Sequence, residues 1–142
     1  MTTLASPTLG GTRSSIWRTE VKPDVKGPVH IFDVEQIWTF LEGEATIELD
    51  GETSTAGPGD TAVLPAHTTR RLTAGPQGYT AIVTAPADAR AWTPGDTGNK
   101  ITPPGSPDRQ PRRSRPVKHR VRGAVLLSAE DFPSRTDPPR RP

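Results

Sequence analysis

EQIWTFLEGE, residues 35–44, is the stretch that decides the fold of this chain. It alternates side chains between two faces and reaches Gly43, as expected of a β-strand that ends at a turn. Downstream, Asp50-Gly51 is a hairpin signal, and Gly59-Asp60 opens a second apolar run that ends at Pro65. The pattern predicts antiparallel strands joined by tight turns.

The same kind of pattern extends outward over most of the first hundred residues. Seven or eight short strand-like segments are separated by connections that mostly contain Gly or Pro. No helical period lies between them, so an all-β sandwich or barrel is expected. The expected strands are residues 16–22, 29–32, 36–41, 45–49, 52–55, 61–64, 68–73 and 79–84.

Charge divides the chain into unlike parts. Residues 1–99 contain seven Lys/Arg and twelve Asp/Glu, whereas residues 100–142 contain eleven and four. We therefore expect a flexible head over residues 1–15, one β-barrel domain over residues 16–94, and a basic Pro/Arg-rich, mostly disordered tail over residues 95–142. Within the tail, residues 124–132 form the one apolar segment that could dock on the barrel.

Composition removes several functional classes. The chain has no cysteine, which excludes disulfides, thiolate zinc sites and a thiol nucleophile. No apolar run approaches membrane-spanning length and no apolar signal core follows the start, so a cytoplasmic location without membrane association is expected. The basic segment 109–122 carries seven Lys/Arg without an interleaved aromatic residue, which argues against a dedicated nucleic-acid site.

The glycine spacing resembles that of the small single-domain cupins. Their first motif reads G(X)5HXH(X)3,4E(X)6G and their second reads G(X)5PXG(X)2H(X)3N. Gly43, Gly59 and Pro65 match these motifs, while Asp24 and His67 stand at two further glycine places. The resemblance covers roughly residues 16–93 and implies a jelly-roll β-barrel with a lumen.

The metal-ligand places of those motifs are only partly kept. The resemblance puts His30 and Gln36 where His and Glu are usual, but Phe32 and Arg70 where two further histidines are usual. The Glu35-Gln36 pair is similar to zinc-dependent polyketide cyclases, in which Gln coordinates metal. Phenylalanine has no lone pair and arginine adds a fixed positive charge. We therefore expect no metal cofactor; a divalent metal, if one binds, would be held by His30 and Gln36.

The resemblance also implies a set of lumen residues, since side chains alternate along a strand. His30, Gln36 and Arg70 are the expected catalytic residues, acting as acid/base, hydrogen-bonding partner and charge anchor. For Arg70, a structural salt bridge to Glu44, Glu48 or Asp60 is an equal alternative. The expected substrate-binding residues are Phe32, Trp38, Phe40, His67 and Leu72, with His67 at the mouth of the barrel.

Three functions remain open from the sequence. The resemblance favours a small-molecule enzyme of specialised, polyketide-like metabolism that performs a non-redox cyclisation, isomerisation or dehydration. A non-catalytic ligand-binding or sensor protein is the first alternative, and a metal-dependent oxygenase is the second. The expected partners are a small-molecule ligand and a second copy of the chain, paired through the face that carries Ile37, Thr39 and Leu41.

Overall fold

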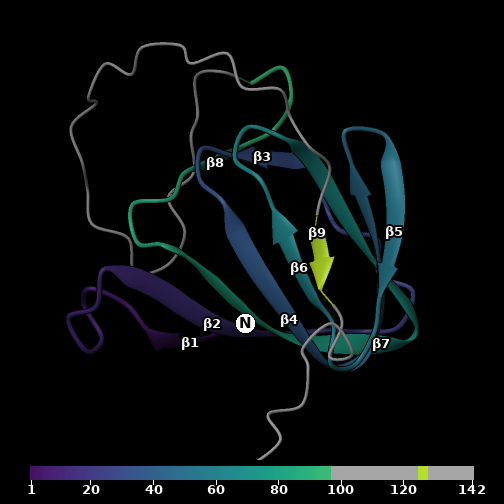
Figure 1. The fold of residues 1–142 in the computed structure, drawn as a ribbon, viewed down its shortest axis with the longest axis horizontal. Helices are drawn as coiled ribbons and strands as arrows, with labels where there is room; N and C mark the ends of the chain where they lie inside the picture. Colours follow the sequence, from purple (N-terminus) through teal and green to yellow (C-terminus); the bar gives the residue numbers. More distant parts are fainter. Residues whose placement is uncertain (97–124, 128–142) are drawn as a thin grey trace, which may run out of the picture.

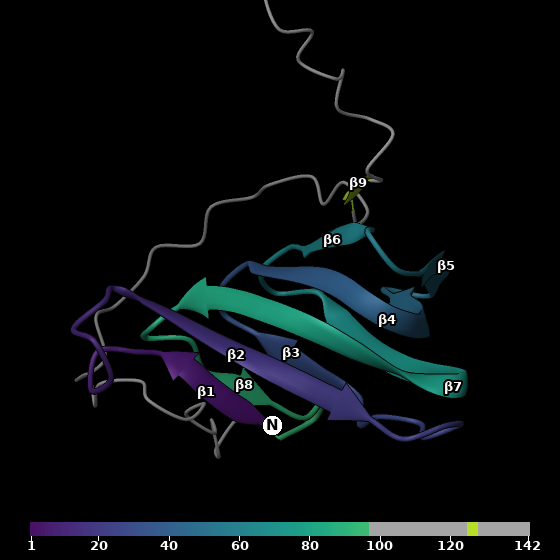
Figure 2. The same cartoon turned by 90° about the horizontal axis from the view of Figure 1, so that it is seen from below.

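The computed structural model of the protein describes residues 1–96 and the backbone of residues 125–127. The described strands pair antiparallel in one curled sheet, in the order β1-β2-β7-β4-β6-β9 (Figures 1 and 2). Three shorter strands extend it: β5 pairs with β4, and β3 lies between β7 and β8. The strands are β1 (Thr2–Ala5), β2 (Ser14–Val21), β3 (His30–Phe32), β4 (Gln36–Leu49), β5 (Glu52–Ala56), β6 (Thr61–Leu64), β7 (Thr69–Pro86), β8 (Ala91–Trp92) and β9 (Val125–Leu127).

Strands β4 and β7 are longer than the sequence predicted. They contain 14 and 18 residues, and each continues through a glycine region that we expected to be a turn. At Gly43 and Gly78 the backbone has positive φ, and a Cβ on Gly43 would collide with the Gly78 carbonyl. The register shifts on both sides of Gly43. Two pairs of expected strands are therefore the halves of two bent strands, which build both ends of the barrel. Residues 36–41 and 45–49 belong to β4, and residues 68–73 and 79–84 correspond to β7.

The N-terminal head differs from the expected flexible segment. Strand β1 pairs with β2, with Thr2 opposite Arg18 and Thr3 opposite Trp17. Residues 6–9 then form a turn in which the Ser6 amide donates to the Leu9 carbonyl at 2.8 Å. Residues 2–5 satisfy the exposed backbone groups of β2 that would otherwise form a free sheet edge. Strand β2 is consequently an inner strand between β1 and β7.

Most of the C-terminal tail lies outside the described residues. The residues that the structure does not describe are 97–124 and 128–142. The predicted disorder and the basic segment 109–122 fall among them. The described exception is β9, which comes from the apolar segment 124–132 and pairs with β6 in the register Thr61 to Leu127. None of the described residues forms a helix that is long and apolar enough to span a membrane.

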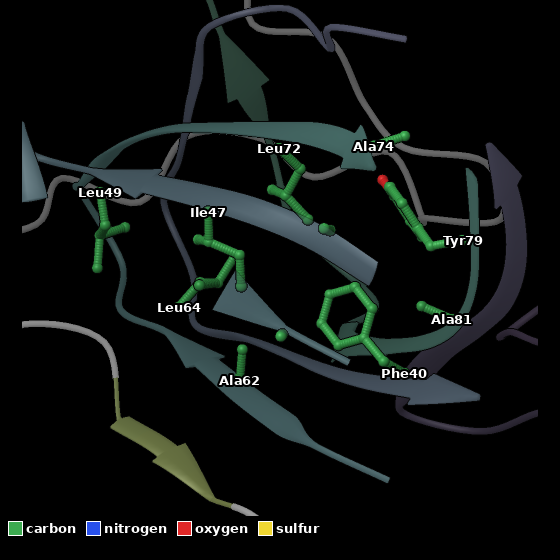
Figure 3. Close-up of a cluster of buried hydrophobic side chains, with 11 residues drawn as sticks. Phe40, Ile47, Leu49, Ala62, Leu64, Leu72, Ala74, Tyr79 and Ala81 are labelled. Carbon is green, nitrogen blue, oxygen red and sulfur yellow. The ribbon is translucent and has the colours of Figure 1, made fainter. Parts of the chain in front are cut away.

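Two clusters of buried side chains fill the inside of the curled sheet. Trp38 packs against both of them. The smaller cluster consists of Trp17, Phe32, Val83, Ala85 and Ala89. The larger cluster, shown in Figure 3, consists of Phe40, Ala45, Ile47, Leu49, Ala56, Ala62, Leu64, Leu72, Ala74, Tyr79 and Ala81. The larger cluster closes one end of the barrel, and the smaller one adjoins a pocket.

Candidate small-molecule site

A pocket of about 370 Å³ opens beside the smaller cluster. Strands β2, β3, β4 and β8 contribute to its wall, together with the chain before β3 and the N-terminus. Its lining consists of Met1, Trp17, Thr19, Pro28, Val29, His30, Phe32, Gln36, Trp38, Ala91, Trp92 and Thr93. Two further hollows, of about 340 and 420 Å³, lie near Gly43 and lack a comparable aromatic lining.

The pocket wall is mainly aromatic. All three tryptophans of the chain line it, and Phe32 adds a fourth ring. His30 contacts Phe32 edge to face, with ring centroids 5.0 Å apart. An apolar wall with a few polar side chains is the usual composition of a site for a small organic molecule. His30 and Gln36 are the polar side chains here that can exchange or direct a proton.

His30 lies in the short strand β3, where it pairs with Arg70 of β7. Its Nδ1 is 3.0 Å from the Pro28 carbonyl oxygen, which can only accept a hydrogen bond. Nδ1 therefore carries the proton, and the neutral ring has a bare lone pair on Nε2. Burial lowers the pKa of His30 below its usual value of 6.5; the Pro28 hydrogen bond opposes this shift, and the positive charge of Arg70 adds to it. The neutral form is thus favoured near pH 7.

Gln36 begins β4 and is fully buried. Its Oε1 accepts hydrogen bonds from Arg70 Nη1 at 3.1 Å and from Trp38 Nε1 at 3.3 Å. Both partners are donors only, so the amide oxygen must face them. The Nε2 group has no partner among the described residues. Gln36 therefore has an amide donor that is still unsatisfied.

Arg70 is almost completely buried, with an exposed fraction of 1%. Besides Gln36, it donates from Nη2 to the Pro65 carbonyl at 2.6 Å and to Thr68 Oγ1 at 3.3 Å. Its Cζ lies 5.2 Å from the centroid of the Phe32 ring, a cation–π distance. Burial lowers the pKa of Arg70 to about 10, against an opposing effect of Asp50, so the side chain stays charged at neutral pH.

The structural salt bridge considered for Arg70 is not formed. Arg71, on the other face of β7, pairs with Glu48 at 3.8 Å instead. Asp60 Oδ2 accepts from the Gly57 amide at 2.9 Å. Among the described residues, no carboxylate forms an ion pair with Arg70. Arg70 is also absent from the pocket lining, which corrects its expected role as a direct anchor for substrate.

Comparison with known families agrees with this architecture. Residues 17–82 match the family model of the cupin domain. These residues form a cupin domain. A search of curated protein sequences gave no match. The all-β jelly-roll barrel expected from the sequence is confirmed.

Solved structures show the same fold at low identity. A cupin 2 domain-containing protein from Halorhodospira halophila is 17% identical, with a TM-score of 0.61 over 66% of this chain and 68% of that chain. Salicylate 1,2-dioxygenase from Pseudoaminobacter salicylatoxidans in complex with gentisate has a TM-score of 0.58 at 17% identity, over 66% of this chain. An oxalate decarboxylase variant from Bacillus subtilis has a TM-score of 0.54 at 15% identity, over 58% of this chain. This cupin spans only 28% and 24% of the last two chains, respectively.

The cupin keeps the backbone geometry of its motif glycines where the residue has changed. Asp24 and His67 have φ angles of 59° and 61°, close to the 65° of Gly43. Non-glycine residues adopt this left-handed conformation rarely. The two substituted positions therefore agree with the alignment to the cupin motifs.

The side chains at the positions of the family's metal ligands are not suited to bind a metal ion. Among the described residues, no group of three or more His, Cys, Asp or Glu is arranged to hold one. Phe32 offers no donor atom, and the Arg70 guanidinium binds the Gln36 oxygen that would otherwise coordinate a cation. A divalent ion beside this guanidinium would meet Coulomb repulsion without a compensating bond.

Some residues expected in the lumen lie elsewhere. Phe40 and Leu72 belong to the larger core cluster, where Phe40 packs on Tyr79 at a centroid distance of 5.6 Å, and they do not line the pocket. His67 is exposed, and its ring lies 6.3 Å from that of Trp92 at the side of the pocket.

Two lining tryptophans were missing from the predicted site. Trp17 was visible as an aromatic residue in a predicted strand. Trp92 stands in β8, which is only two residues long and therefore leaves no periodic signal.

Proposed function

We propose that this cupin binds a small organic molecule in its aromatic pocket and catalyses a non-redox proton transfer on it, as a cyclase, isomerase or dehydratase does. One observation carries the proposal: the side chains of His30 and Gln36 line the same apolar pocket, and one has an acceptor nitrogen while the other has a donor nitrogen without a partner among the described residues. The acceptor is Nε2 of neutral His30, and the donor is Nε2 of Gln36. A base together with an oxyanion donor is the minimum set for enolisation.

The chemistry follows from these two groups. His30 Nε2 takes a proton from a carbon next to a substrate carbonyl, and the C–H electron pair forms an enolate. The Gln36 N–H donates to the oxygen on which the negative charge develops. In an isomerisation, the imidazolium returns the proton to a different carbon. In a cyclisation, the enolate carbon bonds to a second carbonyl of the same molecule, and the imidazolium protonates the resulting alkoxide.

The surrounding aromatic side chains support this reaction. They exclude water from the substrate, which strengthens the hydrogen bond to the developing oxyanion. Four rings also suit a flat, unsaturated substrate, in keeping with the polyketide-like class that the sequence resemblance favours. That class is part of the proposal, as is the cytoplasmic location.

Two alternative functions predict different experimental results. A ligand carrier or sensor would use the same pocket without proton transfer. An oxygenase would need a metal, and the side chains at the metal places argue against one, as described above.

Deuterium exchange tests the proposal with a probe that has an acidic C–H group. The full-length protein is incubated with 2-tetralone in buffered D₂O, and loss of the α-proton signal is followed by NMR. We expect exchange faster than in buffer alone, and a rate roughly 100-fold lower in His30→Gln, as is typical when a general base is lost. The rate should fall with decreasing pH below 6.5, because protonation of His30 removes the base and its pKa is lowered.

Arg71→Gln is the matched control, since Arg71 lies on the outer face, away from the pocket lining. Its exchange rate should equal that of the wild type. If 2-tetralone binds while exchange stays at the buffer rate, the protein is a carrier or sensor and the catalytic proposal fails. Equal exchange rates in wild type and His30→Gln would remove His30 from the mechanism.

A further inference from the structure

Arg70 places a full positive charge inside the protein, and no carboxylate of the described residues forms an ion pair with it, although Asp50 acts on it without a direct contact. Its three hydrogen-bond acceptors are an amide oxygen, a backbone carbonyl and a hydroxyl, all of them neutral. Its Nε has no partner among the described residues. Burying an unpaired charge is costly, and neutral oxygens offset this only in part. The folded protein therefore has a positive potential that an anion would complement.

Gln36 connects this charge to the pocket. Its oxygen binds Arg70 and its free NH₂ group belongs to a side chain that lines the pocket. A cation on the oxygen side withdraws electron density from the amide, so the N–H group becomes a stronger donor. Charge-assisted hydrogen bonds of this kind favour an ionised acceptor over a neutral one. The part of a ligand that contacts Gln36 should therefore be a negatively charged oxygen.

The rest of the pocket selects the body of the ligand. Trp17, Trp38, Trp92 and Phe32 offer aromatic surface, and the volume of about 370 Å³ exceeds that of a two-ring molecule. No carboxylate residue belongs to the lining, so nothing there repels an anion at close range.

We propose that the pocket is selective for flat organic anions, with a carboxylate, enolate or phenolate oxygen bound to Gln36 Nε2 and the buried Arg70 acting through Gln36 as the positioning residue. This inference rests on the proposed function because it concerns the same pocket, but it specifies the charge of the ligand and requires no turnover. It also assigns Arg70 a role that a purely structural arginine would lack.

Three probes of one shape and different charge test the selectivity. Binding of 2-naphthoate, 2-naphthamide and 2-naphthylmethylammonium to the full-length protein is measured by isothermal titration calorimetry. We expect the wild type to bind the carboxylate at least about tenfold more tightly than the amide, and the ammonium most weakly.

Gln36→Glu is the decisive variant. A carboxylate at this position still accepts from Arg70 and Trp38, so the fold is preserved, but it neutralises the cation and removes the donor. Its preference for 2-naphthoate over 2-naphthamide should disappear. Arg71→Gln lowers the net charge by the same amount on the outer face, and it should keep the wild-type preference.

The outcomes separate this inference from the catalytic proposal. Preference for 2-naphthoate without 2-tetralone exchange would support an anion-selective carrier and reject catalysis. Exchange with equal affinity for the three probes would leave catalysis standing and overturn the inference. An anion preference that survives Gln36→Glu would also overturn it. The absence of binding by all three probes would overturn the anion inference, while the exchange assay with 2-tetralone decides the catalytic proposal.

Discussion

Phe32 and Arg70 change the chemistry of the barrel, whereas Asp24 and His67 change only the side chain at positions that keep glycine-like backbone. The first two residues stand where the cupin motifs have histidines. Arg70 Nη1 lies 3.1 Å from the Gln36 oxygen, and its Cζ lies 5.2 Å from the Phe32 ring. A fixed organic cation thus occupies the neighbourhood in which other cupins place a metal ion.

This exchange predicts the metal content of the protein. The purified wild type should contain far less than one equivalent of zinc, iron, nickel or manganese by elemental analysis, and chelators should not change its melting temperature. The double variant Phe32→His with Arg70→His restores two imidazoles beside His30 and Gln36. It should bind about one equivalent of zinc or nickel and melt at a higher temperature when the metal is present, because the ion binds only the folded state.

Stoichiometric metal in the wild type would contradict the idea that Arg70 replaces a cation, and it would favour the oxygenase or zinc-cyclase alternatives. A folded double variant that binds no metal would show that the four side chains do not converge.

Sequence reasoning placed four of the lining residues on one face but could not place the expected residues along the barrel. Alternation in a strand tells which face a side chain takes, so His30, Phe32, Gln36 and Trp38 were all expected inside, and all four line the pocket. Phe40 also points inside, yet it lies at the end of the barrel that Tyr79 and Ile47 fill. The position of a side chain along the barrel axis depends on packing between strands that are distant in sequence. The periodicity within one strand carries no information about that packing. The catalytic roles stay predictions.

At the scale of elements, glycines explain both the success and the error of the strand prediction. Positive φ at Asp50 and Gly51 belongs to the hairpin between β4 and β5, as expected. Positive φ at Gly43 and Gly78 instead lets two continuous strands bend where their backbones approach closely. A turn and a bend place the same demand on a glycine, so the sequence does not distinguish them.

Strand β9 leads to a prediction about the tail. A chain that ends at Asp96 keeps both core clusters and the pairing of β6 with β4, but loses β9, the second partner of β6. It should fold cooperatively and be less stable than full length by about 1–3 kcal/mol in urea denaturation, since each lost hydrogen bond contributes about 1 kcal/mol. A chain that ends at Leu127 keeps β9 and should match full length. Equal stability of all three chains would show that β9 contributes nothing, and an unfolded shorter chain would mean that the tail supplies core.

At the scale of the whole molecule, the outer face of β4 leaves large apolar side chains in contact with solvent. Ile37 and Leu41 have exposed fractions of 39% and 47%. Two copies that pair through this face would remove both side chains from water. We expect sedimentation velocity of the full chain to give the mass of a dimer, and the double variant Ile37→Glu with Leu41→Glu to give that of a monomer. A monomeric wild type would refute the homodimer.

The gathering of every tryptophan at one pocket has a practical consequence. Trp17, Trp38 and Trp92 are the chain's full complement of indole rings, and each belongs to the lining. Tryptophan fluorescence therefore reports on the pocket, without a background from tryptophans elsewhere in the chain. The emission maximum depends on how far the tryptophans of the pocket are exposed to water. Its shift after protein and ligand are mixed follows ligand entry in real time. An unlabelled library of compounds can be screened on this optical signal before any substrate is known.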